Sequence, residues 1–301
     1  MSDALPYYDE AQIAAVLGWD DLIAAMETAL ADFSAGRVIQ PVRNMLTIEE
    51  KLRYLGVMPA IAADSMGAKL VSFYPGNAGT AWPTHMALIV LFDTRTGAPL
   101  AMMDGRLITE MRTAAVSAAV ARRLAPGGGV LALLGSGVQA KAHVEALRHI
   151  LPVAETRVWS RTAENAARFA AGHGARATSA EDAVRGADIV VTATASLEPV
   201  LKGAWLKPGA LVIAVGAPRP TWRELDDDAM RHTLVVDSRD AVLKESGDVI
   251  LSRATIAAEA GEIFAGARTV PAGETTVFKS VGLAVEDIAA ARLVHERART
   301  R

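Results

Sequence analysis

Residues 131–140 read Leu131-Ala-Leu-Leu-Gly-Ser-Gly-Val-Gln-Ala140, an apolar run that ends in the spacing Gly135-x-Gly137-x-x-Ala140. Residues 141–148 continue with helical spacing of apolar side chains. Such a strand–turn–helix suits a dinucleotide, because Gly135 permits the tight turn and Gly137 lets the backbone approach the pyrophosphate. The small Ala140 side chain allows close packing of helix and strand. The stretch therefore predicts a dinucleotide site, the alternative being an ordinary glycine turn between strand and helix.

The pattern of short apolar runs separated by helical segments continues beyond this motif. Strands are expected at residues 130–134, 157–159, 189–192, 211–215 and 234–236, with helices beginning near Gln139, Thr162, Ser179 and Leu225. This alternation predicts βαβ units and a doubly wound, mostly parallel sheet, the α/β architecture of a Rossmann domain. We expect this domain to span residues 121–283, with a hinge at Pro126-Gly-Gly-Gly129.

The residues before 120 follow a different pattern. Residues 10–35 have helical spacing, and strand-like runs follow at 54–58, 68–73, 86–92 and 99–103. A hairpin-type turn lies at 93–97, and residues 109–124 are alanine-rich and helical. These features predict a smaller α+β domain in residues 1–120. A last helix is expected from about 285 to 298.

The composition excludes several classes of function. The chain has 301 residues, 51% of them hydrophobic, and a net charge of −3, which gives no electrostatic case for nucleic-acid binding. It has no cysteine, and its six histidines are scattered, so no metal site is predicted. Residues 1–6 lack the features of a signal peptide, and no apolar run reaches membrane-spanning length. We expect a cytoplasmic protein without a membrane partner.

The end of the second expected Rossmann strand indicates which dinucleotide is bound. An acidic residue at that point holds the ribose 2′-hydroxyl of NAD. Here the stretch reads Val158-Trp159-Ser160-Arg161-Thr162, with no acid and with an arginine between hydroxyls. A guanidinium suits a 2′-phosphate, so we predict NADP(H) as the preferred cofactor, with NAD(H) possible. The alternative is a solvated surface arginine.

Motifs along almost the whole chain resemble the ornithine cyclodeaminase/mu-crystallin family. The matching stretches in the first half are Gly67-Ala-Lys-Leu-Val-Ser-Phe-Tyr-Pro-Gly-Asn77, Leu91-Phe-Asp-Thr-Arg-Thr-Gly97, Met103-Asp-Gly105, Arg112-Thr-Ala-Ala115 and Leu134-Gly-Ser-Gly-Val-Gln-Ala140. The C-terminal third resembles the mu-crystallin branch through Trp222-Arg-Glu-Leu-Asp-Asp227, Val236-Asp-Ser238, Lys244-Glu-Ser-Gly-Asp-Val249 and Thr276-Val-Phe-Lys-Ser280. That branch is similar to ketimine reductases of amino-acid metabolism.

The resemblance implies a homodimer, and it implies that the two domains bind different ligands. It implies that residues 1–120 and 284–301 form a substrate-binding and dimerisation domain. It also implies that Arg43 and Arg112 hold a substrate α-carboxylate and that Lys69 lies beside the reacting carbon and nitrogen. Lys69 stands inside an apolar strand, where desolvation lowers the pKa of an ammonium and suits it to proton transfer. We therefore predict Lys69 as the catalytic residue.

Further candidates follow from position. Thr84 is predicted to contact substrate, and His85 beside it is a weaker candidate. Lys279 and Ser280 are weaker candidates for the nicotinamide region. The predicted cofactor contacts lie at strand ends and helix starts: Thr113, Gly135, Gly137, Val138, Gln139, Ala140, Ser160, Arg161, Thr162, Thr192, Ala193, Val215, Gly216, Asp237 and Ser238.

One departure from the family pattern bears on the reaction. In cyclodeaminases and related amino-acid dehydrogenases an aspartate follows the Gly-Ala or Gly-Gly, where this chain reads Val215-Gly-Ala-Pro218. Proline cannot accept a proton, whereas ornithine cyclodeamination needs a base to deprotonate an amine. Reduction of a protonated ketimine needs only a carboxylate clamp, a placed NADPH and a proton source.

The sequence therefore favours NAD(P)H-dependent reduction of a small ketimine carboxylate. Δ1-Pyrroline-2-carboxylate and Δ1-piperideine-2-carboxylate, which give proline and pipecolate, are the expected substrates. Two alternatives stay open: a linear imino-acid reductase or alanine-type dehydrogenase, with iminosuccinate as one substrate, and a non-catalytic NADPH-dependent small-ligand binder.

Overall fold

The computed structural model describes residues 5–50, 53–77 and 79–300. Residues 1–4, part of the segment assessed for signal-peptide features, lie outside the described residues. Contacts between Cα atoms divide the chain into two compact units, Met1–Arg112 with Leu283–Arg301 and Thr113–Gly282. Helix α3 (Arg106–Leu124) runs through residue 120, where the sequence pattern changes, and the division falls inside this helix. The first unit therefore contains both ends of the chain.

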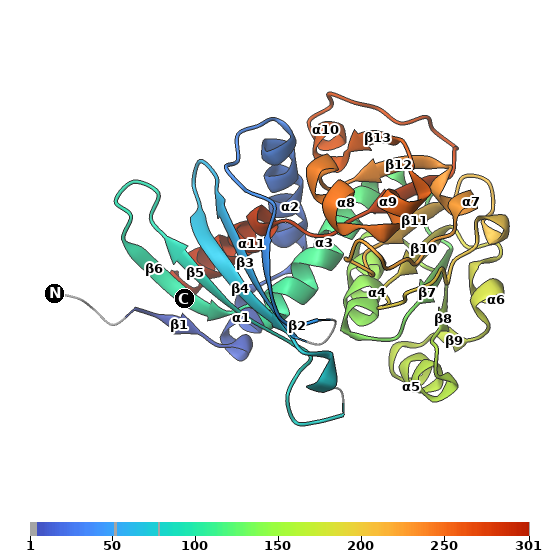
Figure 1. The fold of residues 1–301 in the computed structure, drawn as a ribbon, viewed down its shortest axis with the longest axis horizontal. Coiled ribbons are helices and arrows are strands. Elements are labelled where there is room, and N and C mark those ends of the chain that lie inside the picture. The colour runs from blue at the N-terminus through green and yellow to red at the C-terminus, as the bar shows by residue number, and fades with distance from the viewer. Residues whose placement is uncertain (1–4, 51–52, 78, 301) are drawn as a thin grey trace. The chain divides into compact units, whose positions relative to one another are not determined.

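The described strands of the first unit form one sheet (Figure 1). In sheet order they are β1 (Tyr7–Tyr8), β6 (Pro99–Asp104), β5 (His85–Phe92), β4 (Met66–Phe73), β3 (Arg53–Ile61) and β2 (Asn44–Glu49). Consecutive strands from β2 to β6 pair antiparallel, and β1 pairs parallel with β6. Burial alternates along β3, where Met58 and Ala60 are buried and Val57 and Pro59 only half-buried. The sheet therefore has one covered and one open face.

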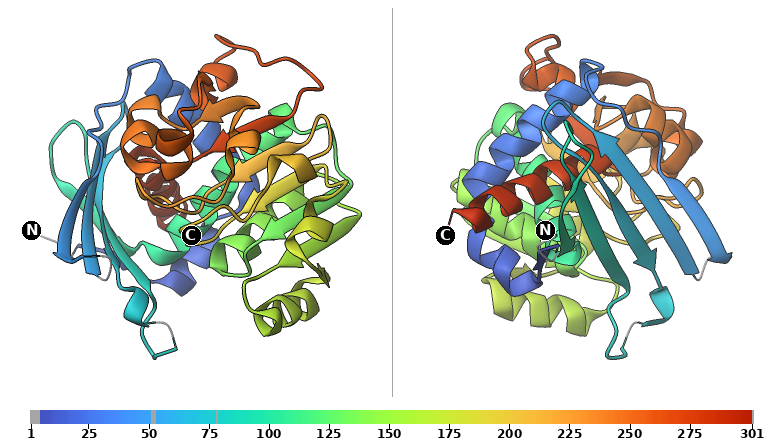
Figure 2. Two further views of the ribbon diagram at one scale, coloured as in Figure 1. Left: turned by 45° about the vertical axis from the view of Figure 1, so that its right-hand side comes forward. Right: turned by 90° about the vertical axis from the view of Figure 1, so that its left-hand side faces the viewer.

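Helices cover the buried face of this sheet. Helix α11 (Ala284–Arg299) contacts β3, β4 and β5, and it lies beside α2 (Trp19–Ser34) in both views of Figure 2. The helical pattern of residues 10–35 is split into α2 and α1 (Glu10–Val16), because Leu17 and Gly18 are extended. A short 3-10 helix, η1 (Pro75–Asn77), follows β4. Among the described residues, no helix has the length and apolar character needed to cross a bilayer.

The second unit contains a parallel sheet. In sheet order its described strands are β13 (Ile256–Glu259), β12 (Thr233–Val236), β14 (Thr276–Lys279), β11 (Leu211–Ala214), β10 (Ile189–Thr192), β7 (Val130–Leu134), β8 (Glu155–Trp159) and β9 (Arg176–Ala177). The helices between them are α4 (Val138–Ile150), α5 (Ala163–His173), α6 (Ala180–Val184), η2 (Gly203–Trp205), α7 (Asp227–Met230), α8 (Arg239–Glu245), α9 (Gly247–Ser252) and α10 (Ala260–Phe264).

The order of these strands confirms the predicted doubly wound fold. The chain moves from β7 to β8 and β9 on one side and resumes with β10 on the other side of β7. Every residue of β10, β11 and β14 is buried, as expected for a parallel sheet covered on both faces. In such sheets ligands bind beyond the carboxyl ends of the strands, where the direction of winding changes. That point lies here between β7 and β10.

A buried ionic network fixes the loops at this edge of the sheet. The Lys279 ammonium, at the end of β14, lies 3.0 Å from a carboxylate oxygen of Asp248 and donates to the carbonyl of Gly216 at 2.6 Å. The Glu224 carboxylate accepts from the Gly216 N–H and from Thr194. Both polar groups of the Gly216 backbone are therefore held from inside the unit. The side chains of Glu224, Asp248 and Lys279 are 0% exposed.

This network should contribute strongly to stability. Lys279→Met removes the cation but leaves Asp248 charged and buried, so we expect the free energy of unfolding to fall by about 3–5 kcal/mol. Lys207→Met is the matched control, because Lys207 pairs with Asp188 near the surface and its loss should cost below about 1 kcal/mol. Urea unfolding followed by tryptophan fluorescence measures both. Equal losses in the two variants would contradict the structural role of the network.

Candidate functional site

Lys69 lies on the covered face of the N-terminal sheet. Its Cα is paired with Met58 on β3 and Ile89 on β5, and both of these side chains are buried. The lysine itself is 2% exposed. Burial among apolar neighbours lowers the pKa of Lys69 to about 8, with Arg112 and Arg43 adding to the fall and Asp287 opposing it. With a pKa of about 8, the lysine is mostly an ammonium at neutral pH, which can donate a proton, with a fraction of neutral amine, which can accept one.

Helix α3 brings Thr109 and Arg112 to this lysine. The two residues are three positions apart and therefore lie on one face of the helix. The Lys69 ammonium donates to the Thr109 hydroxyl at 3.5 Å. Arg112 is 5% exposed. Burial opposes the charge on Arg112, but Asp287 and Glu286 outweigh it and raise the pKa of the guanidinium.

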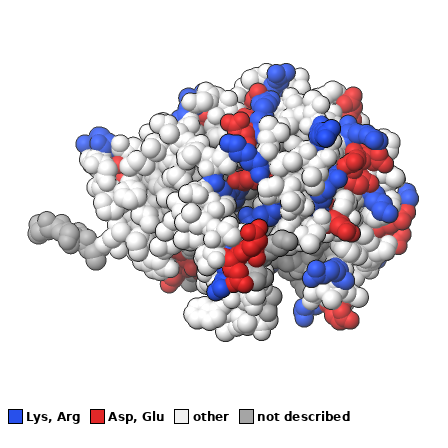
Figure 3. Space-filling model, viewed as in Figure 1, with Lys and Arg blue, Asp and Glu red and all other residues white. Residues whose placement is uncertain are grey.

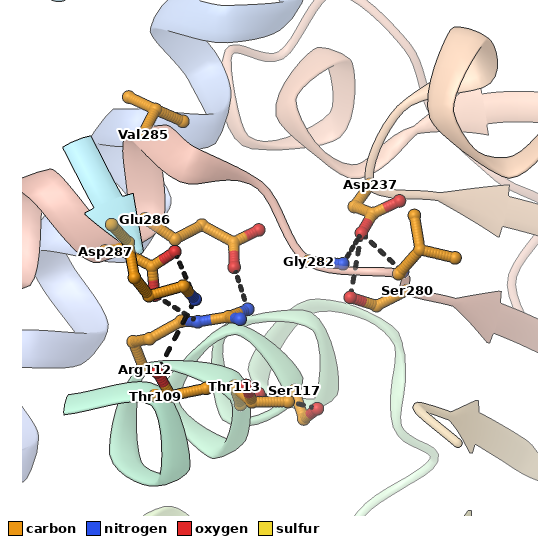
Figure 4. A network of polar contacts seen from close by, with 12 residues as sticks. Thr109, Arg112, Thr113, Ser117, Asp237, Ser280, Gly282, Val285, Glu286 and Asp287 are labelled. Atoms are coloured by element: carbon orange, nitrogen blue, oxygen red, sulfur yellow. Dashed lines mark hydrogen bonds and ion pairs between the residues drawn. The ribbon is translucent and has the colours of Figure 1, made fainter. Parts of the chain in front are cut away.

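The two acids belong to the first turn of α11, as Figure 4 shows. Asp287 accepts from Arg112 Nε at 3.0 Å with one oxygen, and its other oxygen lies 2.6 Å from the Lys69 ammonium. Glu286 accepts from Arg112 Nη1 at 2.5 Å. Both carboxylates are 0% exposed. We call Lys69, Arg112, Glu286 and Asp287 the cation–carboxylate cluster.

The structure brings Arg43 to this cluster but not Thr84. Arg43 directly precedes the β2–β3 ladder, which begins at Asn44 opposite Val57, and it is therefore level with Met58, the partner of Lys69. Thr84 lies five residues from Ile89, the other partner of Lys69, which is about 16 Å along a strand. His85, which begins β5, packs its ring against that of Phe73, with 4.4 Å between the ring centroids and a tilt of 41°.

The glycine turn after β7 has the form that a dinucleotide requires. Gly135 has φ +124°, and a Cβ there would meet the carbonyl oxygen of Ala193 at 2.5 Å. Gly137 is the N-cap of α4, and a Cβ on it would point into open space. No side chain caps α4, so its first N–H groups remain directed at that space. A pyrophosphate fits such a cradle, because the space is open and the helix dipole favours an anion.

A pocket of about 650 Å³ opens beside this turn. Six of the predicted cofactor residues line it: Gly135, Gly137, Ser160, Arg161, Thr162 and Ala193. Arg161 and Arg168 also line it and give it positive charge, and none of the described residues lining it is acidic. Ser136 at the end of β7 donates to Ser160 at the end of β8 at 2.9 Å, which ties the two loops together. The pocket therefore suits an anionic, dinucleotide-like ligand.

The remaining predicted cofactor residues lie in the same unit but do not line this pocket; they are Thr113, Val138, Gln139, Ala140, Thr192, Val215, Gly216, Asp237 and Ser238. Thr192 donates its hydroxyl to Glu224 at 2.8 Å, and the Ser238 hydroxyl caps α8. The Asp237 carboxylate accepts from the Ser238 N–H and, as Figure 4 also draws, from Ser280 and the Gly282 N–H. Their contacts with a cofactor stay a prediction.

The loop after β11 places a proline where a base is expected in cyclodeaminases. Its Ala217 adopts a left-handed conformation with φ 51°, and Pro218 follows it. Glu224 is the acid that supports this loop, and its carboxylate accepts from Thr192, Thr194 and Gly216. Desolvation raises the pKa of this carboxyl group. Lys279, a weaker candidate for the nicotinamide region, is buried in the same network, and its contact with a cofactor stays a prediction.

A family model, described as the ornithine cyclodeaminase/mu-crystallin family, matches residues 9–301. The chain belongs to this family. It is 50% identical over 285 residues, 91% of each chain, to ketimine reductase mu-crystallin of Mus musculus. The structure of Thermococcus litoralis Δ1-pyrroline-2-carboxylate reductase with NADH and L-proline matches with TM-score 0.93 and 32% identity, covering 98% of each chain. An archaeal alanine dehydrogenase dimer with bound NAD matches with TM-score 0.91 and 30% identity, covering 98% and 96%.

Membership of this family confirms the resemblance inferred from the motifs. Sequence reasoning missed Glu286 and Asp287, because two acids in the first turn of a helix are ordinary dipole-stabilising residues. A signal was nevertheless present, since the pair stands in the apolar context Leu283-Ala-Val-Glu-Asp-Ile-Ala-Ala290. Acids in such a context become buried and require cationic partners. The missed residues therefore complete the charge balance around Lys69 and Arg112.

Proposed function

We propose that this protein reduces small cyclic ketimine monocarboxylates with a nicotinamide dinucleotide. Δ1-Pyrroline-2-carboxylate and Δ1-piperideine-2-carboxylate, which yield proline and pipecolate, are the substrates of choice. The observation that carries the proposal is the buried Lys69 ammonium beside Arg112. The names of the relatives support the same class, because one is a ketimine reductase and another a Δ1-pyrroline-2-carboxylate reductase.

Three cationic side chains are gathered around the candidate substrate site. The Lys69 ammonium is close enough to Arg112 and Arg43 for both to lower its pKa, and Asp287 pairs with both Lys69 and Arg112. Such a site suits a substrate carboxylate. A linear dicarboxylate such as iminosuccinate stays an alternative substrate.

In this reaction the protein has two tasks, which are to orient the substrate and to supply one proton. When bound, the reduced cofactor supplies a hydride to the imine carbon. Arg112 and Arg43 bind the substrate carboxylate, which fixes the plane of the ring. Lys69 donates a proton to the imine nitrogen as that carbon is reduced, and water then reprotonates the lysine. Buried positive charge from the arginines stabilises the bound carboxylate throughout.

The other reactions of the family are less well supported. Cyclodeamination and amine oxidation need a base, but the loop after β11 carries Pro218 and the Glu224 carboxylate is engaged with its own unit. A pure ligand binder would not need a lysine whose pKa lies near neutrality. The structural likeness to an alanine dehydrogenase keeps a linear imino acid with one carboxylate as the second candidate.

The decisive experiment follows NADPH oxidation at 340 nm with both cyclic imines, iminosuccinate, iminopyruvate and ornithine. We expect turnover of a cyclic imine and none of ornithine, and a loss of about 100-fold or more in Lys69→Met. Because the pKa of Lys69 is about 8 and the ammonium is the active form, kcat/KM should fall as pH rises above 8. Full imine reduction by Lys69→Met would contradict the role of the lysine.

We further propose that NADPH is preferred to NADH. Arg161 and Arg168 line a pocket beside the N-terminus of α5, and the described lining offers no carboxylate for a ribose hydroxyl. Arg161→Ser should weaken NADPH binding about 10- to 100-fold, the value of one charged phosphate contact, and should leave NADH binding nearly unchanged. Arg231→Ser, an exposed arginine outside the pocket, is the control in fluorescence titrations. Equal weakening of both cofactors would contradict the preference.

We also propose a homodimer formed through the open face of the N-terminal sheet. Leu46, Ile61 and Leu70 lie on this face and are 40% exposed or more, and few charged side chains cover the sheet in Figure 3. An uncovered apolar sheet face is typical of a subunit interface. Leu70→Glu should convert the dimer to a monomer in light scattering after gel filtration. Leu251→Glu, in α9, should not, and a monomeric wild type would refute the proposal.

A further inference from the structure

Asp287 divides its two carboxylate oxygens between two buried cations. Oδ2 lies 2.6 Å from the Lys69 ammonium, and Oδ1 accepts from Arg112 Nε at 3.0 Å. The three side chains come from β4, α3 and α11, so that no two of them belong to the same element. One carboxylate therefore sets the distance between the two cations on which the proposed reaction depends.

We propose that Asp287 is a positioning residue for imine reduction, which fixes the proton donor Lys69 and the carboxylate clamp Arg112 relative to each other. The proposal rests on the proposed function and deepens it. Asp287 touches neither the reacting atoms nor the cofactor in this role and acts through its two partners. A clamp and a donor held at fixed spacing present the imine nitrogen to the ammonium whenever the carboxylate is bound.

The surroundings of Lys69 explain why a carboxylate is needed there. The ammonium faces Asp287 from α11, Arg112 and the Thr109 hydroxyl from α3, and the charge of Arg43 before β2. Burial and the two guanidinium groups favour the neutral amine, whereas Asp287 is the charge that favours the ammonium. Without this carboxylate the lysine would lose its proton at lower pH and could not protonate the imine at neutral pH.

Glu286 provides a matched comparison one residue away. It stands in the same turn of α11, is equally buried, and pairs with Arg112 Nη1 at 2.5 Å. The ion pair of Lys69 is with Asp287. Removing the charge of Glu286 should therefore alter substrate binding through Arg112, whereas removing the charge of Asp287 should alter both binding and protonation.

The test compares Asp287→Asn with Glu286→Gln and the wild type. In Asp287→Asn we expect the alkaline limb of the kcat/KM profile to move down by about one pH unit or more, together with a higher KM for the imine. In Glu286→Gln we expect a higher KM with the alkaline limb in place. NADPH binding should be unchanged in both, and Asp287→Glu should restore the alkaline limb while KM stays raised.

A direct titration separates this proposal from the proposed activity. With ¹³C-labelled lysine, the Lys69 signal is assigned by its absence in Lys69→Met, and its pKa is read whether or not any imine turns over. A lower pKa in Asp287→Asn than in Glu286→Gln is the expected result. The proposal would be overturned if neither the Lys69 pKa nor the alkaline limb of the kcat/KM profile moved in Asp287→Asn. If Asp287→Asn does not fold, a wild-type KM for the imine in Asp287→Glu would overturn it.

Discussion

A buried lysine is tolerated in this protein only because a carboxylate lies beside it. Lys69 stands among apolar side chains of the N-terminal sheet, where a lone ammonium would be strongly destabilised. The compensating Asp287 belongs to α11, more than two hundred residues away along the chain. The first unit therefore cannot be completed without the C-terminal helix. This constraint explains why the chain returns to its first unit after Gly282.

The second unit uses the same principle for a different purpose. Lys279 and Glu224 are buried, and they hold the carbonyl and the N–H of Gly216 respectively. Their effect is to fix the loop that carries Ala217 and Pro218. In the first unit the buried charges surround the lysine to which we assign proton transfer, whereas in the second unit they fix the conformation of a loop.

Much of this architecture was predictable because it depends on local pattern. The Gly135-x-Gly137 turn, the fully apolar strands and the helix starts at Thr162 and Ser179 are determined by residues close together in the sequence. Strand β14 and the partners of Lys69 were not predictable in this way. A four-residue strand that ends in lysine is too short to show a clear periodicity. An ion pair between β4 and α11 cannot be recognised from the sequence of either segment alone. Family resemblance predicted Lys69 and Arg112 as site residues, but their acidic partners Glu286 and Asp287 became visible only in the fold.

The charge balance also explains how one scaffold can serve several reactions. Arginine and lysine beside a bound carboxylate suit any imino acid, and this part of the site does not distinguish reduction from oxidation. The distinction lies in whether a base is available in the loop after β11. With Pro218 there, no carboxylate in that position can take a proton from an incoming amine, whereas a protonated imine needs no base to accept hydride. In the proposed reaction, a single residue on a loop held by Glu224 and Lys279 therefore bears on whether an amine can be deprotonated, while the cation–carboxylate cluster is common to both directions.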